Sequence, residues 1–395
     1  FKNENYTLIN MGYFKQACTE ILEEIKKNNI KTQHELNQLK LKVLNRYKSN
    51  GKLKQIPKNA DIYCAASEEE RQEFKELLSL KPVRTISGVA PIALMSEPYP
   101  CPHTMKGTGP CTYCPGGPGS AFGDVPQSYT GKEPSTRRAI RNNYDPYLIV
   151  FNRLEHYVAM GKIPDKAEII IQGGTFTFFP KAYQEYFVKY ALKAMNDFSK
   201  IFLSEKKIFD FNKFKKFFEL PRILSEEDSR IKKIQKKLFY IKNLDLNDFE
   251  VKKEIDWLFF ENFNDNNISA LGKPKIDNQN GITVSAQNTA LKIIENKIQD
   301  TNIQAIKNVQ QKLKIENNQN ISLKQIQKEN ETSFIRCVGL TIETKSDFGK
   351  LYHGNLMLEL GCTRVEIGVQ SIYEHVLEAT NRGNTVADNI ESIRI

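Results

Sequence analysis

The sequence predicts an α/β fold, because from Thr85 onward short apolar runs are followed by glycine-rich turns and amphipathic helices. This repeated pattern favours βα units around a parallel sheet, as in part of a (β/α) barrel. At 395 residues with 40% hydrophobic residues, the chain can hold two or three domains and a sizeable core. It contains no apolar run long enough to cross a bilayer, so no membrane partner is expected.

The N-terminal region is predicted to be an all-α basic module. Residues 6–29 repeat apolar side chains every three or four positions, and Thr32 with Glu35 forms a capping box that begins a second helix. Between Lys26 and Lys58 there are ten Lys or Arg residues and one acid, a local charge of +9. This block is a candidate contact for a phosphate backbone, and a solvated helix face is the alternative.

Four strands are predicted after this module, at Gly88–Met95, Ala167–Gln172, Cys337–Thr344 and Arg364–Val369. A helix is expected from Asp145 to Met160, with Tyr147, Leu154 and Tyr157 facing inward, and another from Pro180 to about Asn196.

Residues 197–320 break this rhythm, being rich in Lys, Asn, Ile and Phe. We interpret them as a mostly helical insertion that projects from the barrel, with a helix at Ile231–Tyr240 and a loop at 265–288. The predicted organisation is therefore an N-terminal module at 1–80, a first core part at 81–196, the insertion, and a second core part at 321–395.

One loop carries the clearest chemical signal. The stretch CPHTMKGTGPCTYCPGGPGS at 101–120 holds Cys101, Cys111 and Cys114, with nine and then two residues between the thiols. Three thiolates suit a [4Fe-4S] cluster with one open iron, which S-adenosylmethionine (SAM) requires for radical chemistry. A zinc loop with His103 as fourth ligand is the alternative, although a single residue between Cys101 and His103 is tight for one ion.

Several long segments then resemble the catalytic subunit of Elongator, the radical-SAM tRNA uridine carboxymethyltransferase family, in the family's order. Besides the cysteine loop, they are KPVRTISGVAPIALMSEPYPCPH (81–103), PQSYTGKEPSTRRAIRNNYDPY (126–147), IQGGTFTFFP (171–180), RCVGLTIET (336–344) and TRVEIGVQSIYEHVL (363–377). The resemblance implies a partial radical-SAM (β/α) barrel, with a cluster on the three cysteines.

The resemblance also implies where SAM binds, although it assigns no catalytic residue. The turn Gly173, Gly174 and Thr175 directly follows a predicted strand and resembles the family turn that holds the amino group of SAM. Glu343 ends the next strand, where its carboxylate can accept hydrogen bonds from a ribose or an amino group. Glu366 and Gln370 are implied to line the SAM pocket or the barrel mouth.

Two features of the later strands need explanation. A charged residue in a buried strand requires a partner, and Arg364 is the nearest candidate for Glu366 in sequence. Lys345 and Ser346 stand where the family usually has Arg and Pro, so a two-pronged guanidinium contact at that position is in doubt.

By resemblance, the activity is carboxymethylation at C5 of the wobble uridine of tRNA, with acetyl-CoA as co-substrate at a site outside this chain. The cationic residues considered for tRNA binding are Lys40, Lys42, Arg46, Lys48, Lys132, Arg137 and Arg138. A second copy of the chain or other Elongator-type subunits are considered as further partners, and no DNA partner is expected. Seven cysteines with one clustered triad are typical of a reducing compartment, which indicates the cytoplasm.

Three alternatives stay open at this point. The family continues with further strands and an acetyltransferase-like domain, so this chain is expected to be a fragment or a split form that binds cluster and tRNA without completing catalysis. A radical-SAM reaction on a small molecule is the second alternative. A noncatalytic zinc-loop RNA-binding protein is the third.

Overall fold

A computed structural model describes most of the chain, and it divides into two compact units. The described residues are 2–48, 53, 55–78, 86–204, 206–223, 227–261, 303–313 and 321–395. The first unit comprises Phe1–Gly88, Asn152–Pro164 and Lys200–Lys273; the second comprises Val89–Phe151, Asp165–Ser199 and Pro274–Ile395. The predicted loop at 265–288 lies outside the described residues. The four segment boundaries drawn from the sequence stay a prediction.

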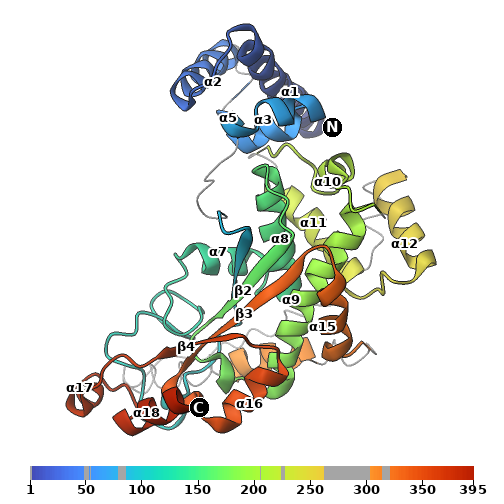
Figure 1. The fold of residues 1–395 in the computed structure, drawn as a ribbon. Coiled ribbons are helices and arrows are strands. Elements are labelled where there is room, and N and C mark those ends of the chain that lie inside the picture. Colours follow the sequence, from blue (N-terminus) through green and yellow to red (C-terminus); the bar gives the residue numbers. More distant parts are fainter. Residues whose placement is uncertain are drawn as a thin grey trace. The chain divides into compact units, whose positions relative to one another are not determined.

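The second unit is built on a four-stranded sheet in the order β1-β2-β3-β4, with every neighbouring pair parallel (Figure 1). The strands are β1 (Val89–Met95), β2 (Lys166–Gln172), β3 (Arg336–Lys345) and β4 (Arg364–Gly368). Each lies within two residues of its predicted bounds. The α/β fold class, a partial (β/α) barrel, is therefore confirmed.

Helices follow the strands as a βα pattern requires. They are α6 (Pro102–Met105), α7 (Pro134–Arg141), α8 (Pro146–Ala159), α9 (Lys181–Phe202), α15 (Leu323–Thr332), α16 (Leu351–Glu359), α17 (Glu374–Ala379) and α18 (Val386–Arg394), with short turns η2 (Phe176–Phe178) and η5 (Ser346–Phe348). The inward side chains predicted for α8, Tyr147, Leu154 and Tyr157, are all buried. The two long predicted helices are confirmed as α8 and α9.

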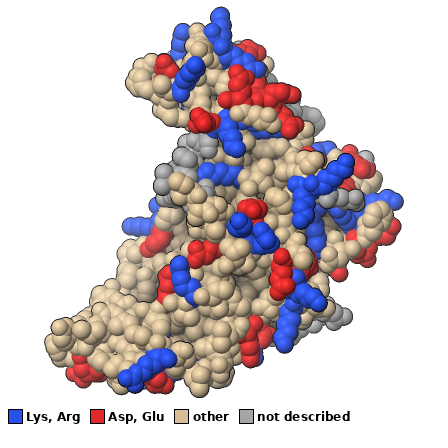
Figure 2. Space-filling model, in the orientation of Figure 1, with Lys and Arg blue, Asp and Glu red and all other residues tan. Residues whose placement is uncertain are grey.

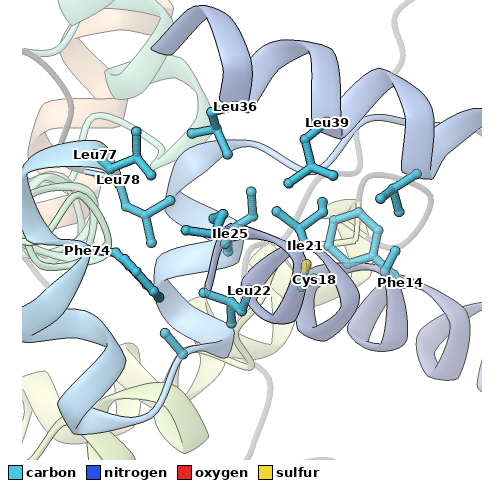
Figure 3. Close-up of a cluster of buried hydrophobic side chains, with 14 of the residues drawn as sticks. Phe14, Cys18, Ile21, Leu22, Ile25, Leu36, Leu39, Phe74, Leu77 and Leu78 are labelled. Atoms are coloured by element: carbon cyan, nitrogen blue, oxygen red, sulfur yellow. The ribbon is translucent and has the colours of Figure 1, made fainter. Parts of the chain in front are cut away.

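The N-terminal part of the first unit is a helical cluster with its own apolar core (Figure 3). Its helices are α1 (Lys2–Lys27), α2 (Gln33–Lys48), α3 (Asn59–Ala65), α4 (Glu68–Glu73) and α5 (Lys75–Leu78). Ile21 and Ile25 of α1 face Leu36 and Leu39 of α2 in this core. The predicted capping box is present, because Glu35 Oε2 accepts from Thr32 N at 3.1 Å and Glu35 N donates to Thr32 Oγ1 at 3.3 Å.

The described first half of the insertion packs on these N-terminal helices. It contains α10 (Phe211–Phe217), α11 (Glu227–Lys242), α12 (Phe249–Asp256) and the π-helical turn η4 (Trp257–Glu261). The Phe211 ring lies edge-on to Tyr63 at 5.8 Å, and the Arg71 guanidinium lies 4.0 Å from the centre of the same ring. Ile223 also packs against the N-terminal core. These residues therefore extend the N-terminal module.

Another part of the insertion joins the second unit. Residues 303–313 are helical, and Lys312 Nζ donates to Glu97 Oε2 at 2.6 Å and to the Asn143 carbonyl at 2.7 Å. Glu97 follows β1, so this lysine neutralises a buried carboxylate beside the end of the sheet.

Replacing Phe211 with Ala is expected to destabilise the first unit by about 3 kcal/mol, because the ring is buried against Tyr63 and Arg71. Urea unfolding measures the change. Phe249→Ala is the matched control, since this ring in α12 is 74% exposed and its removal should have little effect. Equal destabilisation by the two variants would contradict the packing of the insertion on the N-terminal helices.

Candidate functional site

The cysteine loop follows the carboxyl end of β1, and its three thiols line one pocket. Cys101 is buried directly before α6, while Cys111 and Cys114 are partly exposed on the following turn. Cys114 N donates to Cys111 O at 2.9 Å, which closes that turn and brings the last two thiols near each other. All seven cysteines of the chain are free thiols.

A pocket of about 280 Å³ lies at the carboxyl ends of the strands. It collects side chains from segments far apart in sequence, because parallel strands end at the same edge of a sheet. The lining residues are Cys101, Cys111, Cys114, Gln127, Ser128, Tyr129, Gly174, Thr175, Glu343, Thr344, Lys345, Glu366, Ile367, Gly368, Gln370 and Arg382. The three cysteines and five of the six other residues predicted at the site are therefore brought together.

The sixth residue, Gly173, lies beside this pocket without lining it. Its φ is +130°, and a Cβ at this position would stand 2.0 Å from Ser96 Oγ. Glycine is thus required for the close packing of β2 against the end of β1. The neighbouring Gly174, with φ of +87°, is the glycine that lines the pocket.

Glu343 is held by two donors at the pocket wall. Tyr129 Oη donates to its Oε2 at 3.0 Å, and Gln172 Nε2 donates to its Oε1 at 2.9 Å. Burial raises the pKa of Glu343, and the charge of Glu366 adds to this effect, whereas the two donors oppose it. Glu343 and Glu366 are register partners on β3 and β4, which places the two carboxylates side by side.

The expectation that Glu366 lies in a buried strand is wrong. β4 forms an edge of the sheet, and Arg364, Val365 and Glu366 are exposed. Arg364 Nη2 donates to Glu366 Oε1 at 2.7 Å, because residues two apart in a strand share a face. Arg364 Nη1 also lies 3.3 Å from Glu168 Oε1 of β2.

His103, considered above as a fourth zinc ligand, interacts with two charged side chains as well as with Cys111. Its Nε2 lies 2.9 Å from Asp347 Oδ2, and Lys345 Nζ lies 2.6 Å from its Nδ1. The lysine also donates to the Arg382 carbonyl at 3.0 Å. Both ring nitrogens of His103 thus face protein groups, which disfavours the zinc loop.

The Lys345–Ser346 pair is buried and bonded, despite its difference from the Arg-Pro of the resembling family. Lys345 joins α6 to the Arg382 backbone, as just described. Ser346 Oγ donates to Asn389 Oδ1, and the Asn389 amide donates to the Ser371 carbonyl at 3.0 Å. Lys345 therefore ties the end of β3 to α6 and to the Arg382 backbone, and Ser346 ties it to α18.

Sequence reasoning did not single out two donors to the thiols. Gln127 Nε2 lies 2.8 Å from Cys114 Sγ, and Arg382 Nη1 lies 3.7 Å from Cys111 Sγ. Burial alone would raise the pKa of Cys111, but hydrogen bonds from His103 and Arg382 lower it to about 7. Gln127 lies in the segment PQSYTG, which belongs to a stretch that resembles the family. No local pattern in the sequence places Arg382 near Cys111, which lies 271 residues earlier.

The cationic residues of α2 differ in whether their charged groups are free to contact a nucleic acid at the surface. Lys40 was predicted as a tRNA contact, but it is buried and its Nζ donates to Asn59 Oδ1 at 2.9 Å, so its ammonium does not reach the surface. Lys42 and Lys48 are exposed, and Arg46 pairs with Glu20. Figure 2 shows Lys and Arg on the N-terminal helices together with a group of acidic side chains.

Three cations were predicted near the cysteine loop. Lys132 is exposed, with its Nζ 5.6 Å from the centre of the Phe122 ring, and Arg137 is also exposed on α7. Arg138 instead donates to the Ala93 carbonyl of β1 at 3.1 Å. The guanidinium of Arg138 therefore secures α7 to the sheet.

Among the described residues, no three His, Cys, Asp or Glu side chains are close enough to share a single metal ion. The three loop thiols nevertheless line one pocket. Thiolates on a cubane cluster bind different iron atoms and so lie farther apart than ligands on one ion. N–H donors lie beside two of the sulfurs, as is common for side chains that bind metal.

Fold and pocket define the class: a partial (β/α) barrel protein with a three-cysteine pocket at the strand ends, joined to a helical N-terminal module. Residues 14–86 match the ELP3 N-terminal domain family. The chain is similar to Elp3, the Elongator complex protein 3, as the sequence resemblance predicted.

Two relatives illustrate the extent of the match. The tRNA uridine(34) acetyltransferase of Methanocaldococcus jannaschii is 32% identical over 339 residues, covering 86% of this chain and 40% of the relative. Elongator complex protein 3 of Saccharomyces cerevisiae is 30% identical over 383 residues, covering 97% of this chain and 47% of the relative. The chain thus spans less than half the length of these relatives.

A solved structure also matches, namely the archaeal Methanocaldococcus infernus Elp3 with an N-terminal deletion (1–46). It is 22% identical with a TM-score of 0.35, covering 77% of this chain and 34% of that one.

In the part of the chain that the structure describes, no helix is both long and apolar enough to span a membrane.

Replacing Glu343 with Gln is expected to raise the free energy of unfolding at pH 7. Because burial raises the pKa of Glu343, the folded state binds this proton more readily than the unfolded state, and stability falls as pH rises through the shifted pKa. The gain should disappear below the ordinary Glu pKa of about 4.3, where both states are protonated.

Urea unfolding at pH 7 and near pH 4 measures this difference. Glu378→Gln, an exposed carboxylate of α17, is the control that should show no such gain. A Glu343→Gln variant that is less stable than the parent at pH 7 would show that the ionised carboxylate stabilises the pocket.

Proposed function

We propose that this chain is the radical-SAM core and tRNA-binding module of an enzyme that modifies the wobble uridine of tRNA. The relatives named tRNA uridine(34) acetyltransferase and Elongator complex protein 3 support the substrate class. The pocket supports the chemistry, because it joins three thiols to a glycine turn and two carboxylates at the strand ends. That convergence is the observation on which the proposal rests.

The residues fit the two cofactors. Cys101, Cys111 and Cys114 would hold a [4Fe-4S] cluster, which when reduced supplies an electron to SAM. The backbone at Gly173, Gly174 and Thr175 would accept from the amino group of SAM, since glycine lets a ligand approach the main chain closely.

The remaining pocket residues would bind the sugar and methionine parts of SAM. Glu343 is presented by Gln172 and Tyr129 at the pocket wall, where it would accept from ribose hydroxyls or an amino group. Glu366 and Gln370 line the same pocket from the end of β4. The φ of Gln370 is +67°, an uncommon conformation for a non-glycine residue and one frequently found at functional sites.

The proposed reaction is carboxymethylation at C5 of the wobble uridine, with acetyl-CoA as the source of the added group. We assign no residue of this chain to acetyl-CoA. The exposed Lys42 and Lys48 of α2, with Lys132 and Arg137, would contact tRNA phosphates. The free thiols support action in a reducing compartment, the cytoplasm, with a second copy or other Elongator-type subunits as further partners.

A second candidate is a chain that holds the cluster and tRNA without completing the transfer. It corresponds to one of the alternatives that the sequence leaves open. Release of 5′-deoxyadenosine without modification of tRNA would distinguish this case from the full reaction.

Anaerobic reconstitution with iron and sulfide is expected to load about four irons per chain and to permit 5′-deoxyadenosine release from SAM. Replacing Cys101, Cys111 or Cys114 with Ser should abolish both. Cys362→Ser, outside the pocket, is the matched control and should leave both unchanged. A colourless protein with one bound zinc would contradict the radical-SAM proposal and favour the zinc-loop RNA-binding alternative.

Reversing the charge at Lys42 and Lys48 together should weaken tRNA binding and lower the salt dependence of the binding constant. Each lost lysine–phosphate interaction should reduce the slope by about 0.7–0.9, so the loss of both should reduce it by about 1.4–1.8. Filter binding across a salt series measures this slope. The control Lys328→Glu reverses an exposed charge on α15 of the second unit, and an equal effect there would point to nonspecific electrostatics.

A further inference from the structure

A turn near the carboxyl end of the chain, Thr380-Asn381-Arg382-Gly383, closes over the cysteine loop; we call residues 380–383 the latch turn. The Thr380 carbonyl accepts from Thr112 N at 3.0 Å. The Asn381 side-chain amide donates to the carbonyls of Thr108 at 2.5 Å and Pro110 at 3.0 Å. The latch turn therefore satisfies backbone groups on both sides of Cys111.

The cysteine loop needs such external partners. Gly107 and Gly109 have φ of +84° and +79°, so this stretch forms no helix or strand of its own. Glycine-rich backbone has high conformational entropy, which must be overcome to hold three thiols in place. Hydrogen bonds from the latch turn supply part of that restraint.

Gly383, at the end of the latch turn, packs closely against the ring of the buried His103. Gly383 has φ of +76°, and a Cβ there would lie 2.4 Å from His103 Nδ1. Behind it, Lys345 Nζ donates to the Arg382 carbonyl at 3.0 Å. The latch turn is thus held both by α6 and by the end of β3.

Arg382 carries the contact with the site itself. It is only 7% exposed, with Nη2 donating to the Gly368 carbonyl at 2.7 Å and Nη1 directed to Cys111 Sγ at 3.7 Å. Cys114 receives a different donor, the neutral amide of Gln127, at 2.8 Å. The two thiols therefore have unlike surroundings, one beside a cation and one beside an amide.

We propose that Arg382 is a positioning residue, which with Asn381 fixes Cys111 and places a positive charge beside the metal site. This inference rests on the proposed function for its cluster but not for the loop contacts. A cation near the sulfurs favours the more negative, reduced form of a cluster, and donors next to metal ligands fix their orientation.

The first test uses the protein without metal. Trypsin cleaves after lysine, and Lys106 is exposed in the cysteine loop. Arg382→Met and Asn381→Ala should each accelerate this cleavage roughly tenfold, the change expected from removing one or two hydrogen bonds. Cleavage after the exposed Lys206 in the first unit is the internal reference and should not change. Arg394→Met, an exposed arginine of α18, is the matched control.

The second test uses the reconstituted protein. Arg382→Met should lower iron affinity about 10- to 100-fold, as for other partners of metal ligands, and shift the cluster midpoint potential to more negative values. Arg382→Lys should recover the potential more than the affinity, since lysine keeps the charge but lacks the second arm to Gly368.

Outcomes of the two tests separate this proposal from the proposed function. Wild-type protein that binds no iron would overturn the cluster assignment, while the cleavage result would still decide the role of the latch turn. Unchanged cleavage after Lys106 in both Arg382→Met and Asn381→Ala would overturn the latch turn. An unchanged potential in Arg382→Met would overturn the electrostatic role of Arg382.

Discussion

The pocket of the second unit depends on the parallel alignment of its four strands. In-register pairing matches Met95 with Gln172 across β1 and β2, and Glu343 with Glu366 across β3 and β4. Because all four strands run in the same direction, the segments that follow them emerge at one edge. The cysteine loop, the glycine turn, Glu343 and Gln370 share one pocket for this reason.

Alignment alone does not order the cysteine loop. The loop follows β1, but some of its hydrogen-bond partners come from residue 127 and from the latch turn, up to 273 residues away in sequence. Polar groups in such a loop must be paired when they are withdrawn from water. The segment that follows β4 contains the latch turn. The strand order that forms the pocket therefore also brings these hydrogen-bond partners to the cysteine loop.

In the N-terminal module, burial decides whether a cationic residue is available at the surface. Lys40 lies in a strongly basic segment, yet its stem is buried and its ammonium is bonded to Asn59. The insertion, which the sequence separated from this module, contributes Phe211 and Ile223 to it. A sum of local charge therefore overstates the surface available to a phosphate backbone, since some cations serve packing.

The sequence alone determined the strands, the long helices and the three-thiol loop, because hydrophobic periodicity and cysteine spacing are local patterns. The family resemblance added five further residues of the pocket. Tertiary structure decided which distant groups meet those residues. It placed Arg382 beside Cys111, left Glu366 exposed on the edge strand, and directed His103 to Asp347 and Lys345. Such contacts depend on how the chain returns to the sheet, so no neighbouring residue in the sequence indicates them.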